Sequence, residues 1–366
     1  MNKSIKNKLT LLQYILGINA AQIGTSILTL PSDLAKITDT DGWVSIVIGW
    51  LIANTVSLCI IGVMAKHPGA TVYDVLTCYL GKWLGGAWMI VWTSSALFIA
   101  VIIFYRVLEL IQLWVLSNTS NALIAVLFMI PVFMVFRGGI RIFARYAEFV
   151  FFFTLWLPIL LLVPLKDAEF IFMLPLLKEG LLPIVHAVPS TLISFIGFEF
   201  AFILYPYLEN KQAAAKGIII ANTITLLMYL QITVSCFLYF SPDEITRILW
   251  PVLTLIKPIE FPFLERFEII FISYYMFIFS AVFMPFIFIV TSNLKQLCNK
   301  RIWQLPAYIV LSLILASSFV YIPTHSQLQV ISEWWNREAY IVSYAFPVLF
   351  FLYVTWYTRW KNKSLF

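Results

Sequence analysis

The stretch Ile23-Gly24-Thr25-Ser26-Ile27-Leu28-Thr29-Leu30-Pro31 places small and hydroxyl-bearing residues inside the first long apolar segment of the chain. A helix that crosses hydrocarbon must pair its backbone N–H and C=O groups within itself. A Gly-Thr-Ser run weakens a helix at this depth, so the break that it predicts must face protein or water rather than lipid. Broken membrane helices of this kind commonly form binding sites near the bilayer midplane.

The composition indicates an all-α integral membrane protein. Of the 366 residues, 61% are hydrophobic and 11% are charged, whereas an average soluble domain carries about a quarter charged residues. A membrane β-barrel would show short alternating segments instead of continuous runs of about 20 apolar residues. Ten segments are predicted to cross the membrane, at residues 10–36, 43–65, 84–116, 121–136, 144–164, 183–206, 216–240, 264–293, 304–322 and 339–358.

The distribution of charge predicts that both termini lie in the cytoplasm. With that orientation, 16 of the 24 Lys and Arg residues fall on the inner side and 13 of the 18 acidic residues fall on the outer side. This asymmetry follows the positive-inside rule. The rule also explains the formal charge of +6 without a nucleic-acid partner, because the basic residues lie in short loops between apolar segments.

The ten helices divide into two halves of five, about 10–164 and about 183–358, in a single transmembrane domain, 1–366, without a soluble domain. Segment six would begin the second half, and it contains Ser190-Thr-Leu-Ile-Ser-Phe-Ile-Gly-Phe-Glu199. Small residues and a carboxylate therefore interrupt it as Gly24 to Ser26 interrupt segment one. Corresponding breaks in helices one and six are the signature of a 5+5 inverted-repeat transporter fold.

The outer connection between segments seven and eight predicts an amphipathic surface helix from about 242 to 257. Ser241 is a favourable N-cap residue, and Pro242 suits the first helical position. Trp250 would anchor this helix at the membrane interface.

The sequence contains none of the motifs that mark common enzyme classes. It has no His-Glu-x-x-His, phosphate-binding loop, Gly-x-Ser-x-Gly or Cys-x-x-Cys sequence. The histidines His67, His186 and His325 lie at helix ends or in loops, which disfavours a metal site. The four cysteines are far apart in the sequence and are interpreted as free thiols. We therefore expect no enzymatic activity, metal or cofactor.

The break in segment one is the first candidate for ligand binding, and comprises Gly24, Thr25, Ser26 and Ile27. Unwinding there frees backbone N–H groups and exposes the positive end of the following half-helix, and both favour a carboxylate. The alternative is that the small residues only allow close helix packing. The matching break in segment six favours the binding interpretation.

Segment six supplies the second group of candidates, which is Ser194, Phe195, Ile196, Gly197, Phe198 and Glu199. A carboxylate within the membrane is costly and is usually functional or paired. Glu199 could bind a ligand amine, carry a proton or pair with a basic group. Phe195 and Phe198 could line an apolar side-chain pocket or serve as ordinary packing.

Two further features contribute candidates. Arg106 and Glu109 are three residues apart in segment three and can pair on one helical face. We interpret them as a structural or gating ion pair rather than a substrate contact. Ser280 lies deep in segment eight, where it could face the central site.

Taken together, several short motifs give the chain a resemblance to the B subunits of bacterial spore germinant receptors, a branch of the amino acid–polyamine–organocation (APC) transporter superfamily. The likeness covers essentially the whole chain. The motifs are Gly24 to Pro31, Asp41-Gly-Trp43, Leu80-Gly-Lys-Trp83, Glu179-Gly-Leu-Leu-Pro183, Ile193 to Glu199, Ile248-Leu-Trp-Pro251 and Glu265-Arg-Phe-Glu268.

The resemblance implies an APC/LeuT-type fold and a role in sensing. Such a B subunit lies in the spore inner membrane with an A subunit and a lipoprotein C subunit, in contact with membrane lipid. It binds a small nutrient germinant, commonly an amino acid, between broken helices one and six, and binding triggers germination. The likeness carries Gly24 to Ser26, Ser194 to Glu199 and Glu109 over as pocket or polar-interior positions. The family's Gly-small-Gly motif ends here in Ser26, which adds a hydroxyl group and stiffness.

Two alternatives remain open at this point. A proton- or sodium-coupled amino-acid transporter would need the same pocket. A channel or scaffold subunit would retain the fold with an empty pocket.

Overall fold

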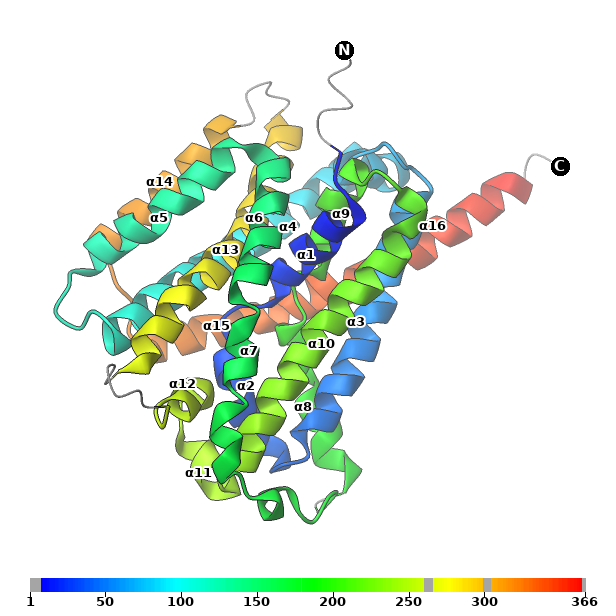
Figure 1. The fold of residues 1–366 in the computed structure, drawn as a ribbon. Coiled ribbons are helices and arrows are strands. Elements are labelled where there is room, and N and C mark those ends of the chain that lie inside the picture. The colour runs from blue at the N-terminus through cyan, green and yellow to red at the C-terminus, as the bar shows by residue number, and fades with distance from the viewer. Residues whose placement is uncertain (1–7, 179, 260–265, 299–303, 364–366) are drawn as a thin grey trace.

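The computed structural model describes residues 8–178, 180–259, 266–298 and 304–363. Glu179 and Glu265, which belong to two of the motifs above, lie outside the described residues. Within these ranges the chain forms helices and no β-strand (Figure 1). The α-helices are α1 (Leu11–Gln22), α2 (Ser26–Thr38), α3 (Gly42–Ala65), α4 (Val72–Trp114), α5 (Asn121–Arg137), α6 (Gly139–Thr154), α7 (Trp156–Leu160), α8 (Leu181–Ser194), α9 (Ala201–Leu204), α10 (Ala214–Tyr239), α11 (Pro242–Arg247), α12 (Pro251–Ile256), α13 (Phe267–Cys298), α14 (Gln304–Val320), α15 (His325–Ala339) and α16 (Phe346–Lys363).

Each predicted apolar segment overlaps one of these helices or a consecutive group of them. Among the described residues, 6 helical stretches are long and apolar enough to cross a membrane, and there are 8 spans if each bent pair counts as one. Two shorter apolar helices, Asn121–Arg137 and Pro306–Val320, occupy predicted segments four and nine. The chain is therefore an all-α integral membrane protein, as the composition predicts.

The breaks predicted in helices one and six are confirmed. The axes of α1 and α2 are bent by 54° across residues 23–25, and α8 is bent by 41° from Phe198–Tyr207. Gly197 adopts a φ of +121°, which a residue with a side chain rarely adopts, so glycine allows the chain to turn at this point. Both spans therefore change direction inside the bundle.

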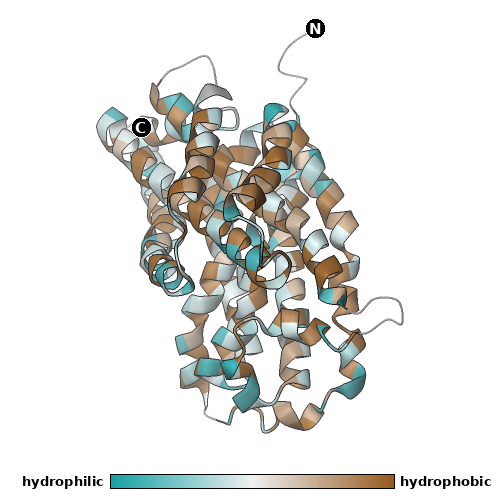
Figure 2. Ribbon diagram, turned by 90° about the vertical axis from the view of Figure 1, so that its left-hand side faces the viewer, coloured by the Kyte–Doolittle hydropathy of each residue, from teal (hydrophilic) through white to brown (hydrophobic). Residues whose placement is uncertain are grey.

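Helix α13 forms the centre of the bundle. In its most apolar window 78% of the residues are buried, compared with 28% to 50% in the other long spans. It packs against α4, α1 and α6. The outer helices instead carry exposed apolar side chains, including Leu352, Trp356 and Trp360 of α16. Figure 2 shows hydrophobic residues along the helices and the most hydrophilic ones toward the lower end, a pattern that suits a lipid-facing surface.

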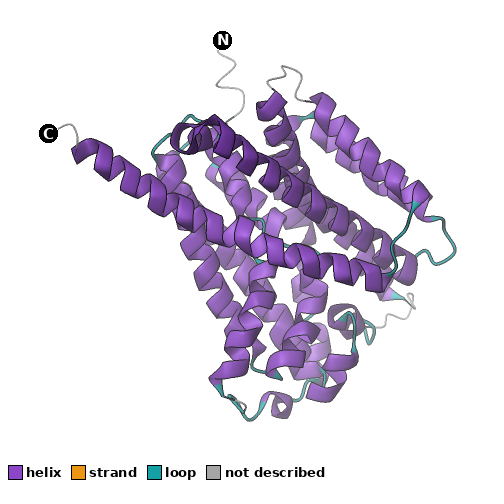
Figure 3. Ribbon diagram, turned by 180° about the vertical axis from the view of Figure 1, so that it is seen from behind, coloured by secondary structure: helices purple, strands orange, loops and turns teal. Residues whose placement is uncertain are grey.

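The last predicted segment extends further toward its N-terminal end than expected. Helices α15 and α16 are joined through a π-helical stretch, Tyr340–Ala345, and together cross the back of the bundle as one long helix (Figure 3). Thr324 and Gln327 form a capping box at its start. The Thr324 hydroxyl accepts a hydrogen bond from the N–H of Gln327, and Oε1 of Gln327 accepts one from the N–H of Thr324. A short helical stretch that begins at Val72, capped by Thr71, precedes the predicted third segment within α4, and Gly81, with φ +79° and ψ 168°, interrupts the helical backbone between the two.

The predicted surface helix from 242 to 257 is wrong. Residues 242–256 form two short helices, α11 and α12, because Pro251 starts a new helix and the backbone is not helical at Ile248 and Trp250. Helix α12 is mostly buried and packs against α2. The connection therefore packs against α2, the second half of helix one.

Replacing Gly197 with alanine should destabilise the fold. An added Cβ would lie 2.4 Å from the carbonyl oxygen of Ala21 and would occupy a strained backbone conformation. We expect a cost of at least about 2 kcal/mol, measured as a lower unfolding temperature of the detergent-solubilised protein. Gly69→Ala is the control, because no atom lies within 4 Å of its added Cβ. Equal unfolding temperatures for the two variants would contradict this account.

Candidate functional site

A cavity of about 480 Å³ lies between α2, α4, α8 and α15. Its volume falls within the range of small-molecule sites, about 300 to 1,000 Å³. Thr25 and Ser26 line it from the break in helix one, and Ser190, Ile193 and Ser194 line it from the end of α8. Its other polar lining residues include Thr29, Asp33, Lys36, Arg106, Glu109, His325, Gln329, Glu333, Asn336 and Tyr340.

Two opposed helix ends meet at this cavity. Helix α2 begins at Ser26, so the first N–H groups of the helix have no acceptor one turn earlier and give that end a partial positive charge. The N–H of Leu28 is an exception, because it donates to the carbonyl oxygen of Thr25 at 3.1 Å. Helix α8 ends at Ser194, where carbonyl groups and the helix dipole give a partial negative charge. The arrangement suits a small ligand that carries one negative and one positive group.

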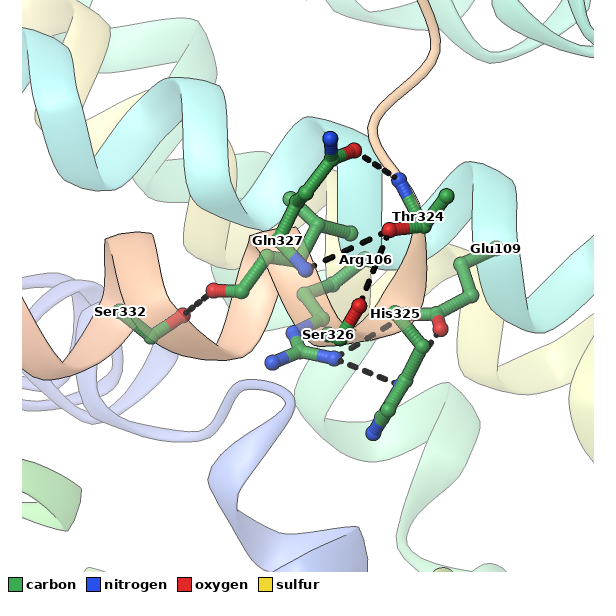
Figure 4. Close-up of polar contacts among 8 residues, drawn as sticks. Arg106, Glu109, Thr324, His325, Ser326, Gln327 and Ser332 are labelled. Atoms are coloured by element: carbon green, nitrogen blue, oxygen red, sulfur yellow. Dashed lines mark hydrogen bonds and ion pairs between the residues drawn. The ribbon is translucent and has the colours of Figure 1, made fainter.

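The wall of the cavity carries a cluster of charged side chains, shown in Figure 4. Glu109 Oε2 is 3.1 Å from Arg106 Nη1, and Glu109 Oε1 is 2.6 Å from His325 Nδ1. Arg106 Nη1 also lies 3.2 Å from His325 Nδ1, so each of the three side chains contacts the other two. The pair predicted from sequence is therefore part of a three-residue cluster that joins α4 to the start of α15.

Sequence reasoning missed His325, which is 216 residues from Glu109 in the chain. The capping box of Thr324 and Gln327 is a local signal that a helix starts there, with His325 in its first turn. Nothing local indicates which helix lies opposite. Trp335 and Tyr340 of the same long helix also line the cavity and were missed for the same reason.

The other candidates of helix one lie away from this cavity. An added Cβ at Gly24 would face Val282 of α13 at 3.4 Å, and the carbonyl oxygen of Gly24 accepts a hydrogen bond from the Tyr275 hydroxyl at 2.9 Å. Ile27 lines a separate, smaller apolar cavity of about 50 Å³ together with Ile23.

The candidates that follow Ser194 are packed in the interior. Phe195 contacts the ring of Tyr229, and Phe198 contacts that of Tyr344. Ile196 is buried. Gly197 lies against the backbone of Ala21, where the two breaks touch.

Glu199 and Ser280 also lie outside the larger cavity. The Glu199 carboxylate accepts hydrogen bonds from the Gly197 N–H at 2.9 Å and from the Ser343 hydroxyl at 3.3 Å. Ser280 Oγ is 2.6 Å from the hydroxyl of Tyr146. The structure therefore brings Thr25, Ser26, Ser194, Arg106 and Glu109 together around one cavity and leaves the other candidates apart from it.

No group of three or more His, Cys, Asp and Glu residues within the described ranges could hold a metal ion. The four cysteines are free.

The bent helices and the cavity beside them define an integral membrane protein with a transporter-like fold. The structure resembles a substrate-bound, outward-open Na⁺-coupled sialic acid symporter, with a TM-score of 0.66 and 11% sequence identity over 92% of this chain and 76% of that chain. Residues 8–326 match the family model described as spore germination protein. The chain belongs to that family.

Several relatives are similar along most of their length. The spore germination protein GerQB of Bacillus cereus is 24% identical over 90% of this chain and 91% of its own. The spore germination protein B2 of Bacillus subtilis (strain 168) is 27% identical over 74% of each chain. The spore germination protein A2 of the same strain is 24% identical over 79% of this chain and 80% of its own.

Removing the carboxylate of Glu109 should destabilise the cavity wall. Glu109→Gln leaves Arg106, whose side chain is only 19% exposed, without its counter-charge. We expect a loss of about 1–3 kcal/mol in unfolding free energy, and partial recovery in the Arg106→Gln/Glu109→Gln double variant. The measurement is the unfolding temperature of the three purified proteins.

The matched control is the exposed pair of Asp33 and Lys36, which are 3.8 Å apart and about half exposed. Asp33→Asn should change stability by no more than about 0.5 kcal/mol. A double variant less stable than Glu109→Gln would show that the cluster does not act as one unit.

Proposed function

We propose that this protein is the germinant-sensing B subunit of a spore nutrient receptor and that it binds an amino acid in the cavity between helices one and six. The observation that carries the proposal is the meeting of the α2 start and the α8 end at one cavity. The family and the transporter-like fold support it. The proposal includes A and C subunits as partners, and a location in the spore inner membrane.

The two ends of an amino acid match the two helix ends. The carboxylate accepts hydrogen bonds from backbone N–H groups at the start of α2, around Thr25 and Ser26. The ammonium group lies at the carbonyl end of α8, near Ser194. The ligand side chain points toward Ile99, Ile102 and Trp335, which supply apolar lining. Glu199 takes no part in this contact, because it lies outside the cavity.

The proposed orientation opens the cavity to the outer side. Both termini lie toward the same end of the molecule (Figure 1), and the inner loops carry most of the basic residues. In this orientation the cavity is lined by Asp33 and Lys36 in the outer half of helix one, and by His325 at the outer start of α15. A nutrient arriving from outside the membrane therefore reaches Thr25 and Ser26 without crossing the bundle.

Ligand binding shifts the receptor by selecting one conformation. A ligand changes such an equilibrium only by binding one state more tightly than the other. An amino acid held by both α2 and α8 favours the state in which these two half-helices are closest. That closure is the signal passed to the partner subunits.

A thermal-shift screen of the purified protein across the twenty standard amino acids tests this function. Stabilisation grows with the ratio of ligand concentration to dissociation constant, and reaches about 2.7 kcal/mol at a hundredfold excess over Kd. We expect a concentration-dependent rise in unfolding temperature with a subset of amino acids.

Substitutions in the cavity should remove this response. Ser26→Leu and Ser194→Leu fill the floor with an apolar side chain, so we expect at least a roughly tenfold weaker apparent affinity for the responding amino acid. Ser273→Leu is the matched control, since Ser273 is exposed on α13 and, among the described residues, its hydroxyl donates to the carbonyl oxygen of Ile269 in its own helix. An unchanged shift in both cavity variants would contradict the site, and no shift with any amino acid would contradict the function.

The similarity to a Na⁺-coupled symporter favours a second candidate, a proton- or sodium-coupled amino-acid transporter. Uptake of a labelled amino acid by proteoliposomes containing this chain alone distinguishes the two. A sensor binds without net uptake, whereas a transporter accumulates the amino acid when an ion gradient is imposed.

A further inference from the structure

A buried polar network lies beneath the cavity and contains no charged residue. Gln22 is the last residue of α1 and is 3% exposed. Its Nε2 atom donates to the carbonyl oxygen of Phe195 at 3.0 Å and to Oδ1 of Asn222 at 2.8 Å. Its Oε1 atom accepts from the hydroxyl of Thr225 at 2.7 Å. One amide thus ties helix one to helix six and to α10.

The network continues away from the cavity into α3. Asn222 Nδ2 donates to Oδ1 of Asn54 at 3.0 Å and to the hydroxyl of Ser57 at 3.1 Å. Asn19 donates to the hydroxyl of Thr225 at 2.8 Å. The carbonyl oxygen of Phe195 can only accept a hydrogen bond, so it must face Nε2, the only donor of the Gln22 side chain.

Gln22 is placed where the two breaks cross. Gly197 packs on the backbone of Ala21, the residue before Gln22, closely enough to exclude any side chain. Phe195 follows Ser194, a cavity-lining residue, and Thr25 lines the cavity three residues after Gln22. Gln22 itself does not line the cavity. Gln22 therefore connects the two helices that line the cavity but does not itself contact the cavity.

The Phe195 carbonyl explains why an amide is needed here. It lies at the end of α8, where the last carbonyls of a helix have no intrahelical donor. In a membrane interior such a group must find its donor in the protein. Gln22 supplies that donor from the other broken helix, so this hydrogen bond links the two breaks directly.

We infer that Gln22 is a positioning residue that couples the break of helix one to the break of helix six, so that a ligand engaging one half-helix also fixes the other. The inference rests on the proposed function for its link to ligand response. Its structural part, the joint behaviour of the two breaks, stands apart from any ligand.

Hydrogen exchange of the full-length, ligand-free protein tests the structural part. Gln22→Met keeps the length of the side chain without its hydrogen bonds, and Gln22→Glu keeps its shape but cannot donate to Phe195 as a carboxylate. Both variants should accelerate amide exchange in peptides covering 23–27 and 195–199 together. Faster exchange at 23–27 alone would overturn the coupling.

Ser57→Ala is the matched control. It removes a buried hydroxyl of the same network, at 0% exposure, but one that bonds to neither broken helix. Its exchange at both breaks should match the wild type. A Ser57→Ala variant as perturbed as Gln22→Met would assign the effect to general loss of packing and overturn the specific role of Gln22.

The functional part uses an equimolar mixture of the twenty standard amino acids as the probe. We expect the concentration that gives half-maximal thermal stabilisation to rise at least roughly tenfold in Gln22→Met, and to be unchanged in Ser57→Ala. A variant that melts at a lower temperature but keeps the wild-type midpoint would show a merely structural role and overturn the inference. If the wild type itself shows no stabilisation, the proposed function fails, and the exchange experiment still decides the coupling.

A measurement on the wild type decides the case in which neither Gln22 variant accumulates. The amino-acid mixture should slow exchange at 23–27 and 195–199 over the same concentration range. Protection of one break without the other would overturn the coupling.

Discussion

The structure depends on one constraint, which is that a membrane interior offers no water to the backbone, so each N–H and C=O group freed by a broken helix needs a protein partner. The two breaks meet this need mainly through side chains of other helices. The Tyr275 hydroxyl donates to the Gly24 carbonyl, the Gln22 amide donates to that of Phe195, and the Tyr344 hydroxyl donates to that of Leu192. These three partners are donors that bind carbonyl groups, whereas the Glu199 carboxylate accepts from the N–H of Gly197. The first-turn N–H groups of α2 are donors themselves and start at the cavity, so they remain suited to an anionic group.

Much of this architecture was predictable from local sequence, because helix weakening is a local property. Glycine and hydroxyl residues in 23–26 and 194–197 mark both breaks. The charge pattern predicts which loops lie on the inner side and which on the outer side. Long-range contacts carry no such signal. Gln22 and Phe195 are 173 residues apart, and Glu109 and His325 are 216 apart. Glu199 illustrates the same limit, because the φ of +121° at Gly197 redirects the chain just before it. Its carboxylate consequently bonds to Ser343 of the π-helical stretch instead of facing the cavity, a rotation that helical periodicity does not reveal.

The two sides of the protein differ in how they are closed. On the side of the chain start, Leu9 donates to the carbonyl of Tyr207 at 2.9 Å and accepts from the N–H of Glu209 at 3.0 Å. This isolated bridge ties the beginning of helix one to the end of helix six. On the other side, the wide cavity is bordered by the connection that carries Trp250 and by the cluster of Arg106, Glu109 and His325. A sensor needs only the second side to change, whereas a transporter must also break the backbone bridge on the first.

The limited binding energy of a small ligand gives the coupling of the two breaks its importance. Moving a two-state equilibrium from 1:99 to 99:1 requires about 5.5 kcal/mol of preferential binding. The total binding free energy of the best small ligands is at most about 1.5 kcal/mol for each non-hydrogen atom. A large share of an amino acid's binding free energy must therefore be specific to one state. Contacts to a single helix end, present in both states, would contribute nothing to the shift. If the carboxylate meets α2 and the ammonium group meets α8, the ligand senses the distance between the two half-helices. Because Gln22 bonds to helix six and to α10, a change in that distance is then transmitted to other helices of the bundle.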